Sequence, residues 1–180
     1  MTLFRDTYRI ESARRKNWDY SLPGWYFVTI CTEKKKTYFG KVLDGEMVLS
    51  DIGEQAASCW KQIPLHHSNI EIDEWIVMPN HVHGIIVMSG PDRLPELHKR
   101  EKIRRVLPLS AVHPKSDSLG SVVGSFKSAV SKWCGVHGRE FGWHERFHDR
   151  ILRGKNSLPA VRQYIRDNPK NWAKDTEFVA

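Results

Sequence analysis

The chain has 180 residues, of which 40% are hydrophobic and 11% aromatic, enough to form one domain with a buried core. Lysine and arginine outnumber aspartate and glutamate by 28 to 21, and the net charge of +7 favours a polyanionic partner such as nucleic acid. No stretch has the length and apolarity of a signal peptide or membrane span, so we expect a cytoplasmic protein without a membrane partner. The sequence has no P-loop motif, so an activity that uses a nucleoside triphosphate is not expected. Cys31, Cys59 and Cys134 are far apart, which predicts reduced and mostly buried thiols.

The segment 1–23 is predicted to be a basic N-terminal arm. Its basic and aromatic residues include Arg14, Arg15, Lys16, Trp18 and Tyr20. This mixture suits an arm that lies on phosphates and bases, although a tail without fixed structure has the same composition. Residues 24–180 are expected to form a single domain, interrupted at 89–118 by a long, flexible, proline-containing connection.

Periodicity within 24–180 predicts four main strands and three helices. In chain order they are a strand at 24–32, a helix from Asp51 to Pro64, strands at 71–78 and 81–88, a helix at 119–133, a strand at 141–153, and a helix from 156 or 157 to 169. Asp51 and Glu54 have the spacing of a capping box at the start of the first helix, and Pro79 and Asn80 predict a tight turn. This order fits an α+β fold, a ferredoxin-like sandwich in which helices cover one face of an antiparallel sheet, with a C-terminal helix added.

Two histidines, His81 and His83, are separated by one residue in a predicted strand. Because side chains alternate along a strand, both imidazoles lie on one face and can converge on a single cation. Histidines at this spacing also occur as ordinary polar strand residues, so the pair alone leaves both interpretations open. His144, Glu145 and His148 form a further group with metal-binding side chains, for which strand surface or DNA contact is the preferred interpretation.

The last predicted helix carries a second group of polar residues. Tyr164 and Asn168 are four residues apart and share a helix face, so a phenol and an amide can point into the same space. A core tyrosine, with an asparagine that ends the helix before Pro169, explains the same residues without a catalytic role. Arg162 and Arg166 suit contact with phosphates, although solvated side chains are equally expected there.

Five segments in a fixed order are more specific than either group of residues. They are G-W-Y-F-V-T-I-C-T after the basic leader, V-M-P-N-H-V-H-G, F-K-S, W-H-E-R-F-H-D-R-I-L-R and Y-I-R-D-N-P. In these segments the chain resembles the REP-associated tyrosine transposases, a branch of the single-tyrosine HUH transposases, and the resemblance covers most of its length. The proline-containing connection is longer than in the compact family pattern.

The resemblance implies a role for particular residues and a class of substrate. His81 and His83 match the metal-binding pair, Tyr164 matches the nucleophile, and Asn168 matches a third polar ligand on the metal side. The implied enzyme is a transposase or endonuclease that uses Mg²⁺ or Mn²⁺ to cleave and rejoin single-stranded or hairpin DNA through a 5′-phosphotyrosine. The basic residues expected to contact this DNA are Arg14, Arg15, Lys16, Lys127, Lys132, Arg162 and Arg166.

Two other functions are compatible with the same residues. A domesticated protein would bind hairpin DNA in a sequence-specific way with little catalysis. A metal-dependent nuclease would instead activate water at His81 and His83, with Tyr164 as a bystander. A monomer and a homodimer are both compatible with the sequence.

Overall fold

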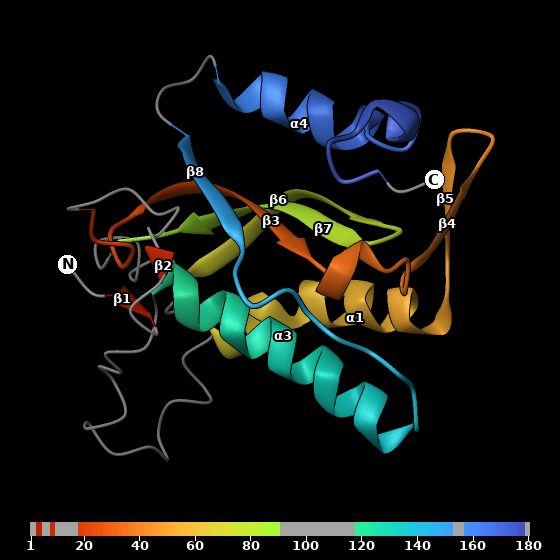
Figure 1. The fold of residues 1–180 in the computed structure, drawn as a ribbon. Coiled ribbons are helices and arrows are strands. Elements are labelled where there is room, and N and C mark those ends of the chain that lie inside the picture. The colour runs from red at the N-terminus through yellow and green to blue at the C-terminus, as the bar shows by residue number, and fades with distance from the viewer. Residues whose placement is uncertain (1–2, 5–7, 10–17, 91–117, 153–156, 179–180) are drawn as a thin grey trace.

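The computed structural model describes five stretches of the chain (Figure 1). They are residues 3–4, 8–9, 18–90, 118–152 and 157–178. The basic residues Arg14, Arg15 and Lys16 and the connection at 91–117 lie outside them, so the arm and the flexible connection stay predictions. Near the N-terminus the short strands β1 (Leu3–Phe4) and β2 (Tyr8–Arg9) pair antiparallel.

An antiparallel four-stranded sheet forms the centre of the fold. Its strands are β3 (Gly24–Cys31), β6 (Ile70–Met78), β7 (His81–Met88) and β8 (His148–Leu152). Their order across the sheet is β6-β7-β3-β8, so the first and third of the four in sequence, β3 and β7, lie in the middle. Pro79 and Asn80 form the predicted two-residue turn, with Met78 opposite His81. This strand order is the ferredoxin-like arrangement that the sequence predicts.

Three helices cover the two faces of the sheet. Helices α1 (Asp51–His66) and α3 (Leu119–Val136) lie on one face, and α4 (Ser157–Asp167) lies on the opposite face (Figure 1). The predicted sandwich and its additional C-terminal helix are therefore confirmed.

Within the described part of the chain, no helix combines the length and the apolar character needed to cross a membrane.

Helix α1 begins at Asp51 as predicted, but its capping residue and its C-terminal end differ from the prediction. The cap is Ser50, whose hydroxyl accepts a hydrogen bond from the N–H of Gly53, so the helix is capped one residue before Asp51. Pro64 does not end the helix, which continues to His66. A proline removes one N–H donor, but near the end of a helix the residues after it can still bond, and the N–H of His67 donates to the carbonyl of Ile63.

A hairpin that the sequence did not predict lies between β3 and α1. It consists of β4 (Gly40–Leu43) and β5 (Glu46–Leu49), and Asp44 and Gly45 form its turn with φ angles of 51° and 77°. Two central residues with positive φ are typical of the turns that suit the twist of a two-residue hairpin. Both strands are short and no residue in them is buried, so their sequence has little apolar alternation to detect.

The fourth strand of the sheet is shorter than the predicted 141–153. β8 begins at His148, and the residues before it pack as an irregular segment instead. Trp143 makes an isolated bridge to Thr32, and its ring contacts Phe39 and Phe126. The aromatic residues that suggest a longer strand are therefore used to fill the space beside β3 and α3.

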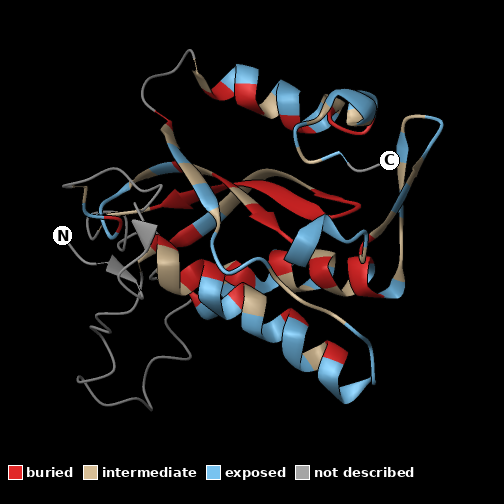
Figure 2. Cartoon of the chain, in the orientation of Figure 1, coloured by how far each residue is buried: buried red, intermediate tan, exposed pale blue. Residues whose placement is uncertain are grey.

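The interior has two apolar clusters, one on each face of the sheet (Figure 2). The larger cluster lies between the sheet, α1 and α3 and includes Val82 and Trp60, whereas the smaller one joins the sheet to α4 through residues such as Ile85 and Ile165. Every residue of β7 is buried because the strand is covered on both faces. Of the cysteines, Cys31 and Cys134 are buried and all three are free thiols, as predicted. A buried strand that carries two histidines has no water to solvate their polar nitrogens.

Candidate active site

The two histidines of β7 lie side by side beneath the C-terminal part of the chain. His81 and His83 are 0% and 3% exposed, and their ring centroids are 4.3 Å apart. Nδ1 of His81 lies 2.9 Å from Oδ1 of Asn80, whose Nδ2 donates to the carbonyls of Lys35 and Glu177. Since Oδ1 of Asn80 can only accept, Nδ1 of His81 carries the proton and its Nε2 keeps a free lone pair.

Nε2 of His81 is available to a ligand. This atom is buried and has no hydrogen-bond partner among the residues that the structure describes. Burial lowers the pKa of His81 to about 3, and the neighbouring His83 adds to the shift, so this imidazole is neutral near pH 7. A buried, neutral imidazole with an unpartnered lone pair is what a metal ligand requires.

Asp175 completes a group of possible metal ligands. Its carboxylate, one Nε2 or Nδ1 atom of His81 and one of His83 all lie within 4.8 Å of one another. Oδ2 of Asp175 is 4.0 Å from Nε2 of His83 and accepts a 2.7 Å hydrogen bond from Nδ2 of Asn168. Burial alone would raise the pKa of Asp175, but its contacts with His83, the N–H of Glu177 and Asn168 outweigh burial and lower the pKa, so the carboxylate is charged.

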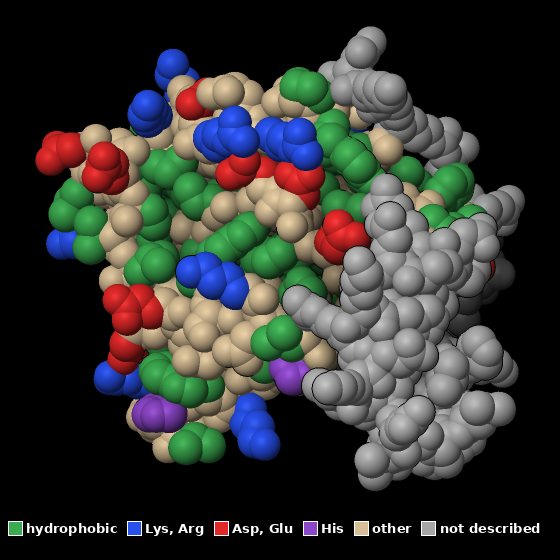
Figure 3. Space-filling model, turned by 180° about the vertical axis from the view of Figure 1, so that it is seen from behind, with side chains coloured by type: hydrophobic (Ala, Val, Ile, Leu, Met, Phe, Trp, Pro, Cys, Tyr) green, Lys and Arg blue, Asp and Glu red, His purple; other side chains and the backbone are tan. Residues whose placement is uncertain are grey.

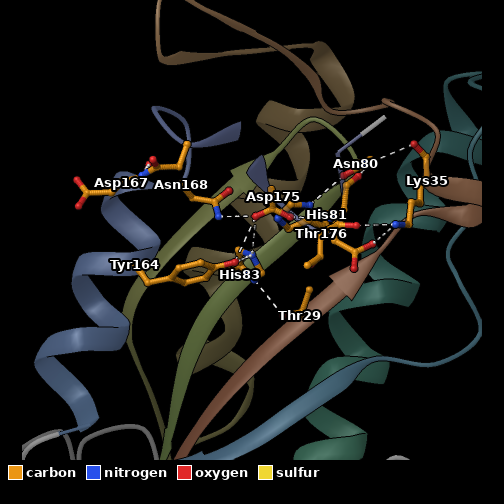
Figure 4. A network of polar contacts seen from close by, with 12 residues as sticks. Thr29, Lys35, Asn80, His81, His83, Tyr164, Asp167, Asn168, Asp175 and Thr176 are labelled. Atoms are coloured by element: carbon orange, nitrogen blue, oxygen red, sulfur yellow. Dashed lines mark hydrogen bonds and ion pairs between the residues drawn. The ribbon is translucent and has the colours of Figure 1, made fainter. Parts of the chain in front are cut away.

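The sequence did not identify Asp175. The residue follows the short 3-10 helix η6 (Trp172–Lys174), in an irregular segment with no periodic pattern to indicate a direction for its side chain. The nearest residue that the sequence predicted to be a metal ligand was Asn168, seven residues earlier. Chain reversal after α4 brings the segment back over β7 (Figure 4).

Asn168 contacts the carboxylate of Asp175. It is buried, and because its Nδ2 donates to Asp175, its Oδ1 is the atom left over. That oxygen is buried and has no partner within the described residues. Two unpartnered polar atoms, Nε2 of His81 and Oδ1 of Asn168, in one buried site fit a bound cation, since such atoms otherwise cost stability.

Tyr164 faces this group from α4 (Figure 4). Its hydroxyl is 3.2 Å from Nε2 of His83 and donates a 3.2 Å hydrogen bond to Oδ2 of Asp175. The edge of its ring meets Phe27 of the sheet, with ring centroids 6.1 Å apart. Burial raises the pKa of Tyr164 to about 12, and the charge of Asp175 adds to the shift, so the phenol keeps its proton near pH 7. The side chain is nevertheless 46% exposed, which leaves it open to a substrate.

Two ion pairs attach α4 to the sheet beside Tyr164. Arg162 donates to Asp73, with Nε 2.8 Å from Oδ1, and Arg166 donates to Glu74, with Nε 2.7 Å from Oε2. The two acidic residues occupy a bulge of β6, where its register against β7 shifts. Both arginines were predicted to contact DNA, and the structure pairs each of them with a carboxylate.

Two further lysines predicted to contact DNA lie far from this group. Lys127 and Lys132 belong to α3, on the face of the sheet opposite α4. The Nζ of Lys127 donates 2.7 Å and 3.3 Å hydrogen bonds to the carbonyls of His144 and Glu145, and Lys132 is exposed. Figure 3, the view from behind, shows the basic side chains of the described residues interspersed with acidic and hydrophobic ones.

A cleft of about 640 Å³ opens next to Tyr164. We call it the β8–α4 cleft. It is lined by Phe27, Thr29 and His83 of the sheet, His148 and Arg150 of β8, Ser157, Ala160, Val161 and Tyr164 of α4, and Thr176 and Glu177 near the C-terminus. Its volume lies within the range of about 300–1,000 Å³ that is usual for ligand sites.

Comparisons with known proteins extend over most of the chain. No family model matches it. An uncharacterized protein of Haemophilus influenzae is 33% identical over 175 residues, which cover 93% of this chain and 92% of the relative. Among solved structures, a REP-associated tyrosine transposase bound to a REP hairpin has a TM-score of 0.59 and 16% identity, and the match covers 91% of this chain and 74% of that chain. At this identity the likeness establishes a common fold.

Proposed function

The chain belongs to the family of the Haemophilus influenzae protein and has the fold of a REP-associated tyrosine transposase, and we propose that it is a single-tyrosine enzyme that cleaves and rejoins DNA strands. Its proposed substrate is single-stranded or hairpin DNA, because the transposase of the same fold is bound to a REP hairpin. The net charge of +7 is consistent with a polyanionic substrate.

The position of Tyr164 is the observation that carries this proposal. Its hydroxyl is 3.2 Å from a histidine nitrogen and 3.2 Å from a carboxylate, although it is on a different element from each. A tyrosine that only filled the core would be buried, whereas Tyr164 is half exposed and its hydroxyl contacts His83 and Asp175. The arrangement has the form of a nucleophile held within reach of a base.

In the proposed reaction the hydroxyl oxygen of Tyr164 attacks a phosphorus atom of the DNA backbone. A bond forms between that oxygen and phosphorus, and the bond from phosphorus to the 3′ oxygen of the preceding nucleotide breaks. The products are a 5′-phosphotyrosine and a free 3′ hydroxyl, and the proton lost by the phenol balances the one gained by the leaving oxygen. The acceptor for the phenol proton is the carboxylate of Asp175, which already accepts the hydrogen bond from the hydroxyl of Tyr164. Because one phosphate ester replaces another, a 3′ hydroxyl can reverse the step without a nucleoside triphosphate.

The residues that would hold a divalent ion are His81, His83 and Asp175, with the amide oxygen of Asn168 as a further donor. This mixed set of nitrogen and oxygen atoms suits Mg²⁺ or Mn²⁺, whereas a structural zinc site would use four nitrogen or sulfur ligands. When bound, the ion would supply positive charge that polarises the scissile phosphate.

The proposal is tested by incubating the purified protein with Mn²⁺ and labelled single-stranded hairpin DNA, followed by a denaturing gel. We expect a covalent protein–DNA adduct with the wild-type chain and none with Tyr164→Phe or His81→Ala. Arg139→Ala is a matched control, since Arg139 pairs with Asp51 at the start of α1, away from the site.

The outcomes separate this function from its alternatives. Cleavage that persists in Tyr164→Phe without an adduct would identify a nuclease that activates water at the histidines. Hairpin binding without cleavage across several metals and hairpins would identify a DNA-binding protein with little catalysis. Either result would overturn the strand-transfer mechanism.

A further inference from the structure

The β8–α4 cleft contains a cationic side chain that the proposed chemistry does not use. Arg150 lies on β8, directly opposite Phe27 of β3, and paired residues of neighbouring strands point to the same face. Phe27 belongs to the cluster on the α4 side, so Arg150 also projects toward α4 and lines the cleft. The arginine is exposed and shares this space with Tyr164.

Arg150 differs from the neighbouring arginines in having no partner of its own. It makes no ion pair or hydrogen bond with any residue that the structure describes, whereas Arg162, Arg166 and Arg139 are each paired with a carboxylate. Its five N–H donors are therefore unused by the described residues, and a guanidinium group is well matched to phosphate oxygens. His148, one pleat further along β8, lines the same side of the cleft.

The remaining walls of the cleft are partly apolar and partly acidic. Phe27 and Ala160 form an apolar wall against which a sugar or a base can pack. Glu177 also lines the cleft, and it forms an ion pair with Lys35 at 3.3 Å. Arg150 would attract a phosphate, whereas the charge of Glu177 is already compensated by Lys35.

We propose that the β8–α4 cleft binds one nucleotide of the substrate strand next to the phosphate that Tyr164 attacks, with Arg150 contacting a backbone phosphate and Phe27 supporting the sugar or base. This assignment rests on the proposed function, because it needs a DNA strand to pass Tyr164. It adds Arg150 of β8, a residue that the sequence did not suggest as a DNA contact.

The test compares DNA binding by wild type, Arg150→Ala, Arg150→Lys and the control Arg139→Ala. The probe is a fluorescein-labelled hairpin oligonucleotide with a randomised single-stranded extension, and anisotropy is measured in EDTA over a range of salt concentrations. We expect Arg150→Ala to bind about tenfold more weakly than wild type. We also expect the slope of log K against log salt to become shallower by about 0.7, the value for one phosphate on a single strand.

The other variants define what would overturn the assignment. Arg150→Lys keeps the charge and should keep the salt slope, and Arg139→Ala should change affinity by less than about twofold, because it lies outside the cleft. Unchanged affinity and slope in Arg150→Ala would overturn the assignment. An equal loss in Arg139→Ala would also overturn it, since the effect would then come from net charge alone.

The adduct assay on the same proteins keeps the two proposals apart. At limiting DNA, Arg150→Ala should form less tyrosine adduct than the wild type, in proportion to its weaker binding, whereas Arg139→Ala should form as much as the wild type. A normal adduct together with unchanged DNA binding would overturn the cleft assignment and leave the strand-transfer mechanism standing. If DNA binding depends on Arg150 but the wild type forms no adduct, the cleft assignment stands and the strand-transfer mechanism is overturned. A wild-type chain that binds no DNA would overturn both proposals.

Discussion

Nε2 of His83 lies 3.2 Å from the hydroxyl oxygen of Tyr164, although 81 residues separate the two in the chain. The histidine belongs to the central strand β7 and the tyrosine to α4, which packs on that strand's face of the sheet through its own apolar side. The contact thus depends on how α4 packs against the sheet.

Tyr164→Phe should abolish the covalent adduct and leave the fold intact. The residue is half exposed and its hydroxyl makes contacts that water can replace, so the free energy of unfolding should change by about 1 kcal/mol or less. Urea denaturation measures the stability, and the denaturing gel measures the adduct. An adduct formed by the phenylalanine variant would show that another residue is the nucleophile.

Asp175→Asn should weaken binding of Mn²⁺ by about tenfold or more, because it removes the negative charge from the group formed with His81 and His83. Isothermal titration calorimetry with the metal alone measures the affinity without any need for DNA. Asp167→Asn is the matched control, since Asp167 bonds Gln163 on the outer surface of α4. Equal affinity in wild type and Asp175→Asn would remove Asp175 from the ligand set.

The Arg162–Asp73 ion pair should stabilise the protein in a pH-dependent way. The hydrogen bond from Arg162 lowers the pKa of Asp73 in the folded state. A depressed pKa contributes stability above the unfolded value of about 3.9 and loses it as the pH falls through the folded value. The difference in unfolding free energy between wild type and Asp73→Asn, about 1 kcal/mol near pH 7 for a partly exposed pair, should therefore shrink below about pH 4. A difference that stays constant from pH 7 to pH 3 would contradict this account.

Gly84→Ala should destabilise the protein by about 1–3 kcal/mol or more. A Cβ atom at residue 84 would lie 2.2 Å from Cζ2 of Trp60, which is fully buried between the sheet and α1. Gly124→Ala is the control, because within the described structure nothing apart from its chain neighbours and the backbone of α3 itself lies within 4 Å of its Cβ position. That substitution should leave the stability equal or raise it by up to about 1 kcal/mol, because alanine favours a helix. Urea denaturation of both variants checks the contrast.

Local patterns in the sequence were sufficient for the order of the elements. Alternation in 81–88 predicted a strand with both histidines on one face, and the spacing of Tyr164 and Asn168 placed them together on one helix face. Two predictions about single elements were wrong or missing. Pro64 was predicted to end the first helix, which continues to His66. The half-exposed hairpin 40–49 was not predicted, because it has too little apolar alternation to detect.

The sequence by itself determined the elements and the kinds of side chain that can do chemistry, because both depend on periods of a few residues along one chain. Only the tertiary structure decided which of those side chains meet. Asp175 joins the histidines through an irregular segment, Arg162 and Arg166 are paired with the acids of a bulge, and Arg150 is left unpaired in a cleft. Such contacts arise between residues distant in sequence, where packing of the two apolar clusters sets the geometry and no local period records it.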